Sequence, residues 1–163
     1  MSERKRVPME LRLTRQEIGA FWPCRAVHPA DREDLAILLY AAFRGTIDDE
    51  GETFADALVE IDRMFGDDYG KPLLDCSFVI ERGEFLASAC LICLSEPDGV
   101  PLVVFSMTRP DAQREGLARY LMRRSIDALL DRGHTRLRLI VTEGNAKAQS
   151  LYASLGFRPI AAT

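Results

Sequence analysis

The run from Gln113 to Ala118 has the composition of an anion-binding helix start. An apolar stretch is followed by a Pro-Asp turn, and a helical pattern begins near Gly116. The first N–H groups of a helix have no partner inside it and carry partial positive charge, so they can hold a pyrophosphate that approaches closely. Gly116 and Ala118 leave that approach open, and Arg114 adds a charge. The same pattern is also typical of an ordinary turn into an amphipathic helix.

A second run, from Asn145 to Phe157, surrounds a tyrosine with helix-capping residues. Asn145 stands where a helix N-cap is expected, and Gly156 stands where that helix should end. Tyr152 lies on the apolar face of this helix. A tyrosine there is more often a core residue than a catalyst, and its hydroxyl needs a partner if it is buried.

Two cysteines, Cys90 and Cys93, have the CxxC spacing of metal and redox sites. The residues around them predict a strand, and residues three apart on a strand point to opposite faces. We therefore interpret both as small buried side chains and predict no metal site. The lone histidines, His28 and His134, are interpreted as structural or solvated.

Periodicity predicts the elements that must position these residues. Helices are expected over residues 29–43, 53–65, 117–132 and 146–155, and strands over 24–27, 75–81, 85–94, 102–108, 136–142 and 157–161. Turn chemistry joins three of the strands into an antiparallel meander, whereas the step from 102 to 142 through a helix requires a parallel crossover. We predict an α/β (α+β) fold with a mixed, mostly antiparallel sheet of about six or seven strands and about four helices.

Composition limits the class of protein and its partners. The 163 residues carry a formal net charge of −4, which disfavours general binding of nucleic acid. No apolar run is long enough to span a membrane, and the first residues lack the apolar centre of a signal peptide. We expect one domain at residues 21–163, an accessory or loose segment at residues 1–20, and a cytoplasmic location, which suits the four cysteines.

Charge is distributed unevenly along the chain. Residues 31–70 contain twelve acidic and three basic residues, whereas residues 109–158 contain ten basic and five acidic ones. A cationic ligand would suit the first region and a polyanionic ligand the second. Solvated helix faces explain the same pattern.

Taken together, the two runs resemble the GNAT superfamily of N-acetyltransferases. The resemblance is strong over residues 102–157 and extends to residues 24–94 only in the order of elements. Gln113, Gly116 and Ala118 match the pattern [Q/R]-x-x-G-x-[G/A], with less common choices at its first and last positions. The later pattern N-x-x-A-x-x-L-Y-x-x-x-G-F is matched in full by Asn145, Ala148, Leu151, Tyr152, Gly156 and Phe157.

The resemblance implies acetyl-CoA as co-substrate, with no metal, and a binding role for each matching segment. The pyrophosphate would rest on the backbone amides of Gln113, Arg114, Glu115, Gly116, Leu117 and Ala118. The pantetheine arm would pair with Ser106, Met107 and Thr108 like an added strand, in a gap between strands 102–108 and 136–142. Asn145 would help to hold it.

The resemblance also implies the reaction. A primary amine of a small molecule or peptide would attack the thioester directly in a ternary complex. A backbone N–H near Met107 or Thr108 would stabilise the oxyanion, and Tyr152 would protonate the departing thiolate. The general base is left open: Glu143, Glu81, Glu84 and a water relay are the candidates.

The acceptor is expected to lie against the first two helices and the acidic loop between them, residues 47–52. We hypothesise that Asp48, Asp49, Glu50 and Glu52 favour a cationic amine, such as a polyamine, an aminoglycoside-like molecule or a peptide N-terminus. A solvated loop is the alternative. A non-catalytic acyl-CoA sensor and an interaction domain are the rival functions. Homodimers are common among relatives, and the sequence leaves open whether this chain forms one.

Overall fold

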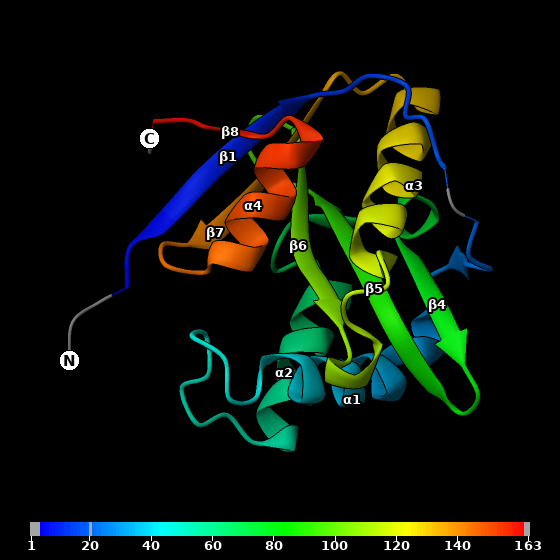
Figure 1. Ribbon diagram of the computed structural model, residues 1–163, viewed down its shortest axis with the longest axis vertical. Coiled ribbons are helices and arrows are strands. Elements are labelled where there is room, and N and C mark those ends of the chain that lie inside the picture. The colour runs from blue at the N-terminus through cyan, green and yellow to red at the C-terminus, as the bar shows by residue number, and fades with distance from the viewer. Residues whose placement is uncertain (1–3, 20, 162–163) are drawn as a thin grey trace.

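The structure is a computed structural model that describes residues 4–19 and 21–161. In the described residues, a mixed eight-stranded sheet lies between two pairs of helices (Figure 1). The strands are β1 (Arg6–Arg12), β2 (Arg25–Ala26), β3 (Lys71–Pro72), β4 (Phe78–Arg82), β5 (Phe85–Leu94), β6 (Pro101–Thr108), β7 (Arg136–Thr142) and β8 (Arg158–Pro159). The helices are α1 (Arg32–Phe43), α2 (Phe54–Phe65), α3 (Leu117–Asp131) and α4 (Ala146–Leu155).

The strand order is β2-β4-β5-β6-β7-β1-β8, and β3 pairs with β5 beside β4. Every pair of strands is antiparallel except β6 and β7, which are joined through α3 and run parallel. The predicted α/β (α+β) class, the antiparallel meander and the parallel crossover are therefore confirmed. The sheet exceeds the predicted number of strands because β1 and β3 were not expected.

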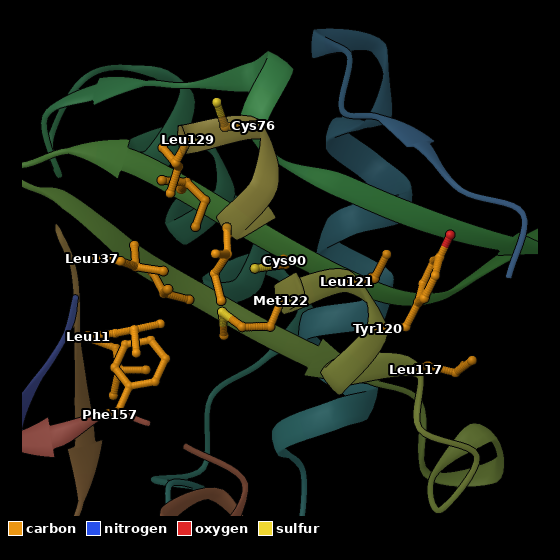
Figure 2. Close-up of a cluster of buried hydrophobic side chains, with 14 of the residues drawn as sticks. Leu11, Cys76, Cys90, Leu117, Tyr120, Leu121, Met122, Leu129, Leu137 and Phe157 are labelled. Atoms are coloured by element: carbon orange, nitrogen blue, oxygen red, sulfur yellow. The ribbon is translucent and has the colours of Figure 1, made fainter. Parts of the chain in front are cut away.

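The core lies on both faces of the sheet. Helices α3 and α4 cover one face, and α1 and α2 cover the other (Figure 1). Strand β5 is buried on both sides. Cys90 packs with Leu121 and Leu129 in the cluster under α3, which we call the α3 cluster. Cys93 packs with Leu38 and Ile61 in the cluster under α1 and α2, which we call the α1–α2 cluster. The prediction that these two thiols point to opposite faces is confirmed. Figure 2 shows Leu121, Met122 and Leu129 of the α3 cluster, which lie over the strands.

Capping residues set the helix ends that matter for the site. Thr53 caps α2, because its hydroxyl accepts a hydrogen bond from the Asp56 N–H and the Asp56 side chain returns one to the Thr53 N–H. Asn145 caps α4 by accepting from the Ala148 N–H at 3.3 Å. Gly156 ends α4 with a φ of 103°, a conformation that favours glycine. These predicted caps are confirmed.

Residues 6–12 differ from the expectation of a loose or accessory segment. They form β1, which pairs with β7 over its whole length and carries β8 on its other edge. Met9 and Leu11 point into the core and are 5% and 6% exposed. The flanking charged residues hide this short alternation in the sequence. Residues 1–3 and 20 of the expected segment, and residues 162–163 of the expected domain, lie outside the described residues, and the boundary at residue 20 stays a prediction.

Two expected elements begin differently because 3₁₀ turns replace their first residues. Strand β4 starts only at Phe78, after the 3₁₀ turn Leu74–Cys76, and α1 follows the 3₁₀ turn Pro29–Asp31. The second turn is capped by His28, whose Nδ1 accepts from the Ala30 N–H at 3.0 Å. The structural interpretation of His28 is thereby confirmed.

Candidate active site

Strands β6 and β7 separate along their length. They pair only where Leu102 and Val103 face Arg138 and Leu139, near their first residues. A β-bulge lies at the same point, because Leu91 pairs with Phe105 while Ile92 pairs with Val103, leaving Val104 without a partner on β5. A bulge bends its strand. Ser106, Met107 and Thr108 therefore form an edge of β6 that β7 does not cover, which is the gap predicted for the pantetheine arm.

The turn after β6 presents unpaired backbone donors. Among the described residues, no N–H from Gln113 to Arg119 donates to a protein acceptor, and the first that does is the Tyr120 N–H, which donates to the Gly116 carbonyl at 3.0 Å. Gly116 has a φ of 83° and no side-chain cap. Helix α3 therefore begins with N–H groups that have no partner in the protein, at the positive end of its dipole.

The side chains of this turn differ in position. Gln113, Arg114 and Glu115 are exposed, and Gly116 is exposed with them. Leu117 is buried in the core, which fixes the helix start, and Ala118 is half-buried. The small side chain of Ala118 is the reason that we expect an anion to approach these donors closely.

Two contacts hold the turn in place. Arg82 of β4 donates two hydrogen bonds to the Glu115 carboxylate, at 2.8 Å and 2.9 Å, and holds the pKa of Glu115 below its usual range. Lys147, in the first turn of α4, donates to the Gln113 side-chain oxygen at 3.4 Å. The two sequence runs therefore meet in space. Lys147 was missed by the sequence analysis, since its position in the second pattern accepts any residue.

Tyr152 extends from α4 toward the exposed edge of β6. Its ring packs edge-to-face against Phe157, with centroids 5.8 Å apart. Burial raises the pKa of the Tyr152 phenol to about 12, the Cys90 thiol and the Asp48 carboxylate add to the rise, and the Ser106 hydroxyl opposes it. The phenol is therefore a protonated donor at neutral pH, beside one of the three residues predicted to line the gap.

The end of β6 is fixed by a buried hydroxyl. Ser88 of β5 is fully buried and donates to the Met107 carbonyl at 2.9 Å, while its oxygen lies 2.9 Å from the Thr108 hydroxyl. The Met107 side chain packs into the α1–α2 cluster. The backbone around Met107 and Thr108 is held firmly at the position where a thioester carbonyl is expected. Ser88 was missed because a serine inside an apolar strand carries no distinct sequence signal.

The acidic loop between α1 and α2 lies against the end of β7. Thr142 donates from its hydroxyl to the Asp48 carboxylate at 2.6 Å. Nearby, a Cβ on Gly144 would come within 3.1 Å of the Ile47 side chain, so the two segments pack closely. Asn145 follows directly and is occupied in capping α4. The structure thus brings this loop to the open end of the gap.

The expected base candidates lie at different distances from this gap. Glu81 is on β4, where it binds Arg25, and Glu84 lies in the β4–β5 turn. Both are separated from β7 by β5 and β6 in the strand order. Glu143 follows β7 directly and has an exposed side chain. Of the three, only Glu143 adjoins the site.

Other features lie apart from the site or concern the whole chain. A hollow of about 370 Å³ between β1, α4 and β8 contains none of the predicted site residues. Within residues 4–19 and 21–161, no three His, Cys, Asp or Glu side chains gather as a metal site would require. In the same residues, none of the helices has the length and apolar character needed to cross a membrane.

Sequence comparison gives a match to a protein family and to curated relatives. Residues 35–157 match the family model described as the acetyltransferase (GNAT) family. The chain is 39% identical over 80 residues to the mycothiol acetyltransferase of Beutenbergia cavernae, a segment that is 48% of this chain and 26% of that protein. It is 52% identical over 48 residues to the ribosomal protein bS18-alanine N-acetyltransferase of Escherichia coli, which is 29% of this chain and 32% of that protein. The alignments thus span about a quarter and a third of these relatives.

Solved structures share the fold. The ribosomal-protein-S18-alanine N-acetyltransferase from Escherichia coli superposes with a TM-score of 0.64 and 24% identity, over 85% of this chain and 79% of that one. A GNAT family acetyltransferase from Brucella melitensis, crystallised in complex with acetyl-CoA, gives a TM-score of 0.63 with 19% identity, over 86% and 88% of the two chains. At these identities the likeness is one of fold.

Proposed function

Because the chain belongs to the acetyltransferase (GNAT) family, we propose that it transfers an acetyl group from acetyl-CoA to a primary amine of a small molecule or peptide. The observation that carries this proposal is the pairing of two features at one place. Unpaired N–H groups begin α3, and β6 and β7 separate beside them. The first feature suits a pyrophosphate, and the second suits an extended arm that adds to a strand edge.

The chain's own residues supply the binding. The amides of Gln113, Arg114, Glu115, Gly116, Leu117 and Ala118 hold the pyrophosphate. The unpaired edge at Ser106, Met107 and Thr108 holds the pantetheine arm, and Asn145 fixes the start of α4 beside the gap. The bound coenzyme supplies the acetyl group as a thioester.

Catalysis depends on position and on one proton donor. A backbone N–H near Met107 or Thr108 polarises the reacting carbonyl, and the buried Ser88 hydroxyl keeps this backbone in place. The amine attacks directly while both substrates are bound. Tyr152 then gives its proton to the departing thiolate, since its phenol is protonated at neutral pH. Glu143 or a water relay takes the proton of the amine.

The names of the two curated relatives differ in acceptor, since one refers to mycothiol and the other to the alanine of a ribosomal protein. We therefore propose no finer acceptor at this point than a primary amine. The free cysteines support a reducing compartment, the cytoplasm, as the location. We also propose that the domain includes β1, because β8 joins the sheet through it.

Two measurements test the proposal. A ligand that binds only the folded state raises the midpoint of thermal unfolding, so acetyl-CoA should stabilise the protein. Mass spectrometry of a panel of amines incubated with acetyl-CoA should show an acetylated product. Stabilisation without any product would indicate a non-catalytic sensor. The absence of both would indicate an interaction domain and overturn the proposal.

A further inference from the structure

The carboxylates of the loop between α1 and α2 have different roles. Asp49 accepts hydrogen bonds from the Gly45 N–H at 2.7 Å and from the Gly51 N–H at 2.8 Å, and so holds the loop together. Glu52 accepts from the Glu50 N–H at 2.9 Å. The Glu50 side chain is exposed and makes no hydrogen bond among the described residues. Asp48 is the member of this group that reaches another part of the fold.

Asp48 is only partly satisfied where it lies. It is half-buried, and its Oδ1 accepts a single hydrogen bond, from the hydroxyl of the buried Thr142. Among the residues that the structure describes, its Oδ2 has no hydrogen-bond donor, and no Arg, Lys or His forms an ion pair with it. This oxygen is not one of the buried side-chain atoms that lack a partner, so an incoming group can reach it. The free oxygen therefore has capacity for a positively charged donor.

The position of Asp48 relates it to the reacting groups. Thr142 is the last residue of β7, at the open end of the gap between β6 and β7. Thr142 holds Asp48 there through a hydrogen bond of 2.6 Å, and the neighbouring Ile47 packs against Gly144, just before α4 begins at Ala146. The Asp48 carboxylate therefore lies where β7 ends, beside the start of the helix that carries Tyr152.

We propose that the Asp48 carboxylate binds the ammonium form of the acceptor beside the thioester, and that the amine passes one proton to Glu143 or a water relay before its nitrogen attacks, so that the enzyme selects primary amines that are cationic at neutral pH. The proposal rests on the proposed function and adds a class of substrate to it. An ammonium has three donors, and a hydrogen bond between opposite charges is stronger than one between neutral groups. Asp48 is thereby a specificity residue, distinct from the general acid Tyr152.

A purely structural role for Asp48, as an anchor of the loop on Thr142, makes a different prediction, and three variants separate the two. Asp48→Asn removes the charge but keeps an oxygen that accepts from Thr142. Thr142→Val removes the anchor but keeps the charge. Glu50→Gln removes the same charge from the same loop at an exposed side chain that makes no hydrogen bond or ion pair with the described residues, so it is the matched control.

The experiment measures acetylated product by mass spectrometry at saturating acetyl-CoA, with two sets of acceptors. Alkyl diamines, an aminosugar and a peptide with a free N-terminus are cations at neutral pH, whereas arylamines are uncharged. We expect wild-type protein to acetylate the cationic set. Asp48→Asn should raise KM for that set by about tenfold or more, the worth of one charged hydrogen bond, with coenzyme affinity unchanged. Glu50→Gln should change KM by less than about twofold.

Each other outcome overturns the inference. An unchanged KM in Asp48→Asn, or equal increases in Asp48→Asn and Glu50→Gln, would remove Asp48 from amine recognition. Equal losses for cations and arylamines, reproduced by Thr142→Val, would assign Asp48 to anchoring the loop. A wild-type protein that binds coenzyme A but acetylates no cationic amine overturns this inference alone. A wild-type protein that does not bind coenzyme A overturns the proposed function itself, together with the inference.

Discussion

The two sides of the candidate site are built in different ways. On the coenzyme side, the turn between β6 and α3 presents main-chain N–H groups from one continuous stretch of sequence. On the acceptor side, Asp48 and Thr142 meet through their side chains although they are 94 residues apart along the chain. A site made of backbone donors tolerates many side chains and depends on local conformation. A site made of side chains depends on how distant loops dock.

The two sides also differ in charge. The start of α3 carries the positive end of a helix dipole, with Arg114 exposed and Lys147 close to the turn. The loop between α1 and α2 carries carboxylates. The first segment would therefore attract a polyanionic coenzyme, and the second would attract a cationic amine. Variants should affect one side and leave the other unchanged.

Removing the proposed proton donor, Tyr152, should have the largest effect. Tyr152→Phe should lower kcat by about 100-fold or more, because general acids contribute on this order, while coenzyme affinity stays the same. The phenylalanine ring keeps the packing against Phe157. Steady-state kinetics and calorimetric titration with coenzyme A measure the two quantities. Full activity would exclude Tyr152 from the reaction.

A substitution at the start of α3 should affect the coenzyme side alone. Gly116 and Gly133 flank this helix with φ values of 83° and 86°, and an added Cβ would meet nothing within 4 Å at either position. Alanine at each should cost about 1–2 kcal/mol of unfolding free energy because of the left-handed conformation. Gly116→Ala should also weaken coenzyme A binding by about tenfold, since a relaxed turn misaligns its donors.

Gly133→Ala serves as the control, because it carries the same backbone cost at the far end of the same helix. Chemical denaturation gives the stability of each variant, and calorimetry gives its affinity. Equal affinities in the two variants would contradict the assignment of the turn as the pyrophosphate site.

Loosening the acidic loop should produce a smaller change on the acceptor side. Thr53 ends this loop and caps α2, with its hydroxyl accepting from the Asp56 N–H at 3.2 Å. Thr53→Ala should lower the unfolding free energy by about 1 kcal/mol, the usual cost of a lost N-cap. KM for the amine should rise while coenzyme affinity holds. Thr53→Ser keeps the cap and should restore both values, and a change in coenzyme affinity would show that the two sides are not independent.

The smallest expected effect concerns alkaline pH, where kcat should stay unchanged up to about pH 10. A general acid works while it is protonated, so Tyr152 should lose its role only as pH rises through its pKa of about 12. An ordinary tyrosine would be half ionised near pH 10. We expect kcat, measured with both substrates saturating, to show no fall assignable to Tyr152 up to about pH 10, with circular dichroism verifying the fold. A fall in kcat below about pH 10 that is absent in Tyr152→Phe would contradict the buried environment of the Tyr152 phenol.

The sequence was informative wherever one continuous segment determines a structure. Strand β5 has the bounds predicted from its apolar run, and the caps Thr53, Asn145 and Gly156 lie where their residue types indicated. The turn before α3 also follows from local chemistry. Each of these depends on residues a few positions apart, whose conformational preferences act without help from the rest of the fold.

The features that the sequence did not reveal depend on contacts between distant segments. Strand β1 gains its structure by pairing with β7, and its own alternation is short and flanked by charge. The bulge at Val104 arises from the register between β5 and β6. The Asp48–Thr142 contact exists because a loop packs against the end of another strand. The acidic loop was recognised by composition, yet composition does not distinguish Asp48 from Asp49.

The location of β1 has a consequence for how the protein is made. Glu10 and Arg138 join β1 to β7 at 2.9 Å across 128 residues of sequence. β1 is therefore synthesised well before β7, and both of its edges stay unpaired until β7 has been translated. Contacts between such distant segments slow folding, and unpaired edge strands invite aggregation. This half of the sheet is completed only after β7 has been synthesised, and a nascent chain that stalls before β7 leaves β1 unpaired.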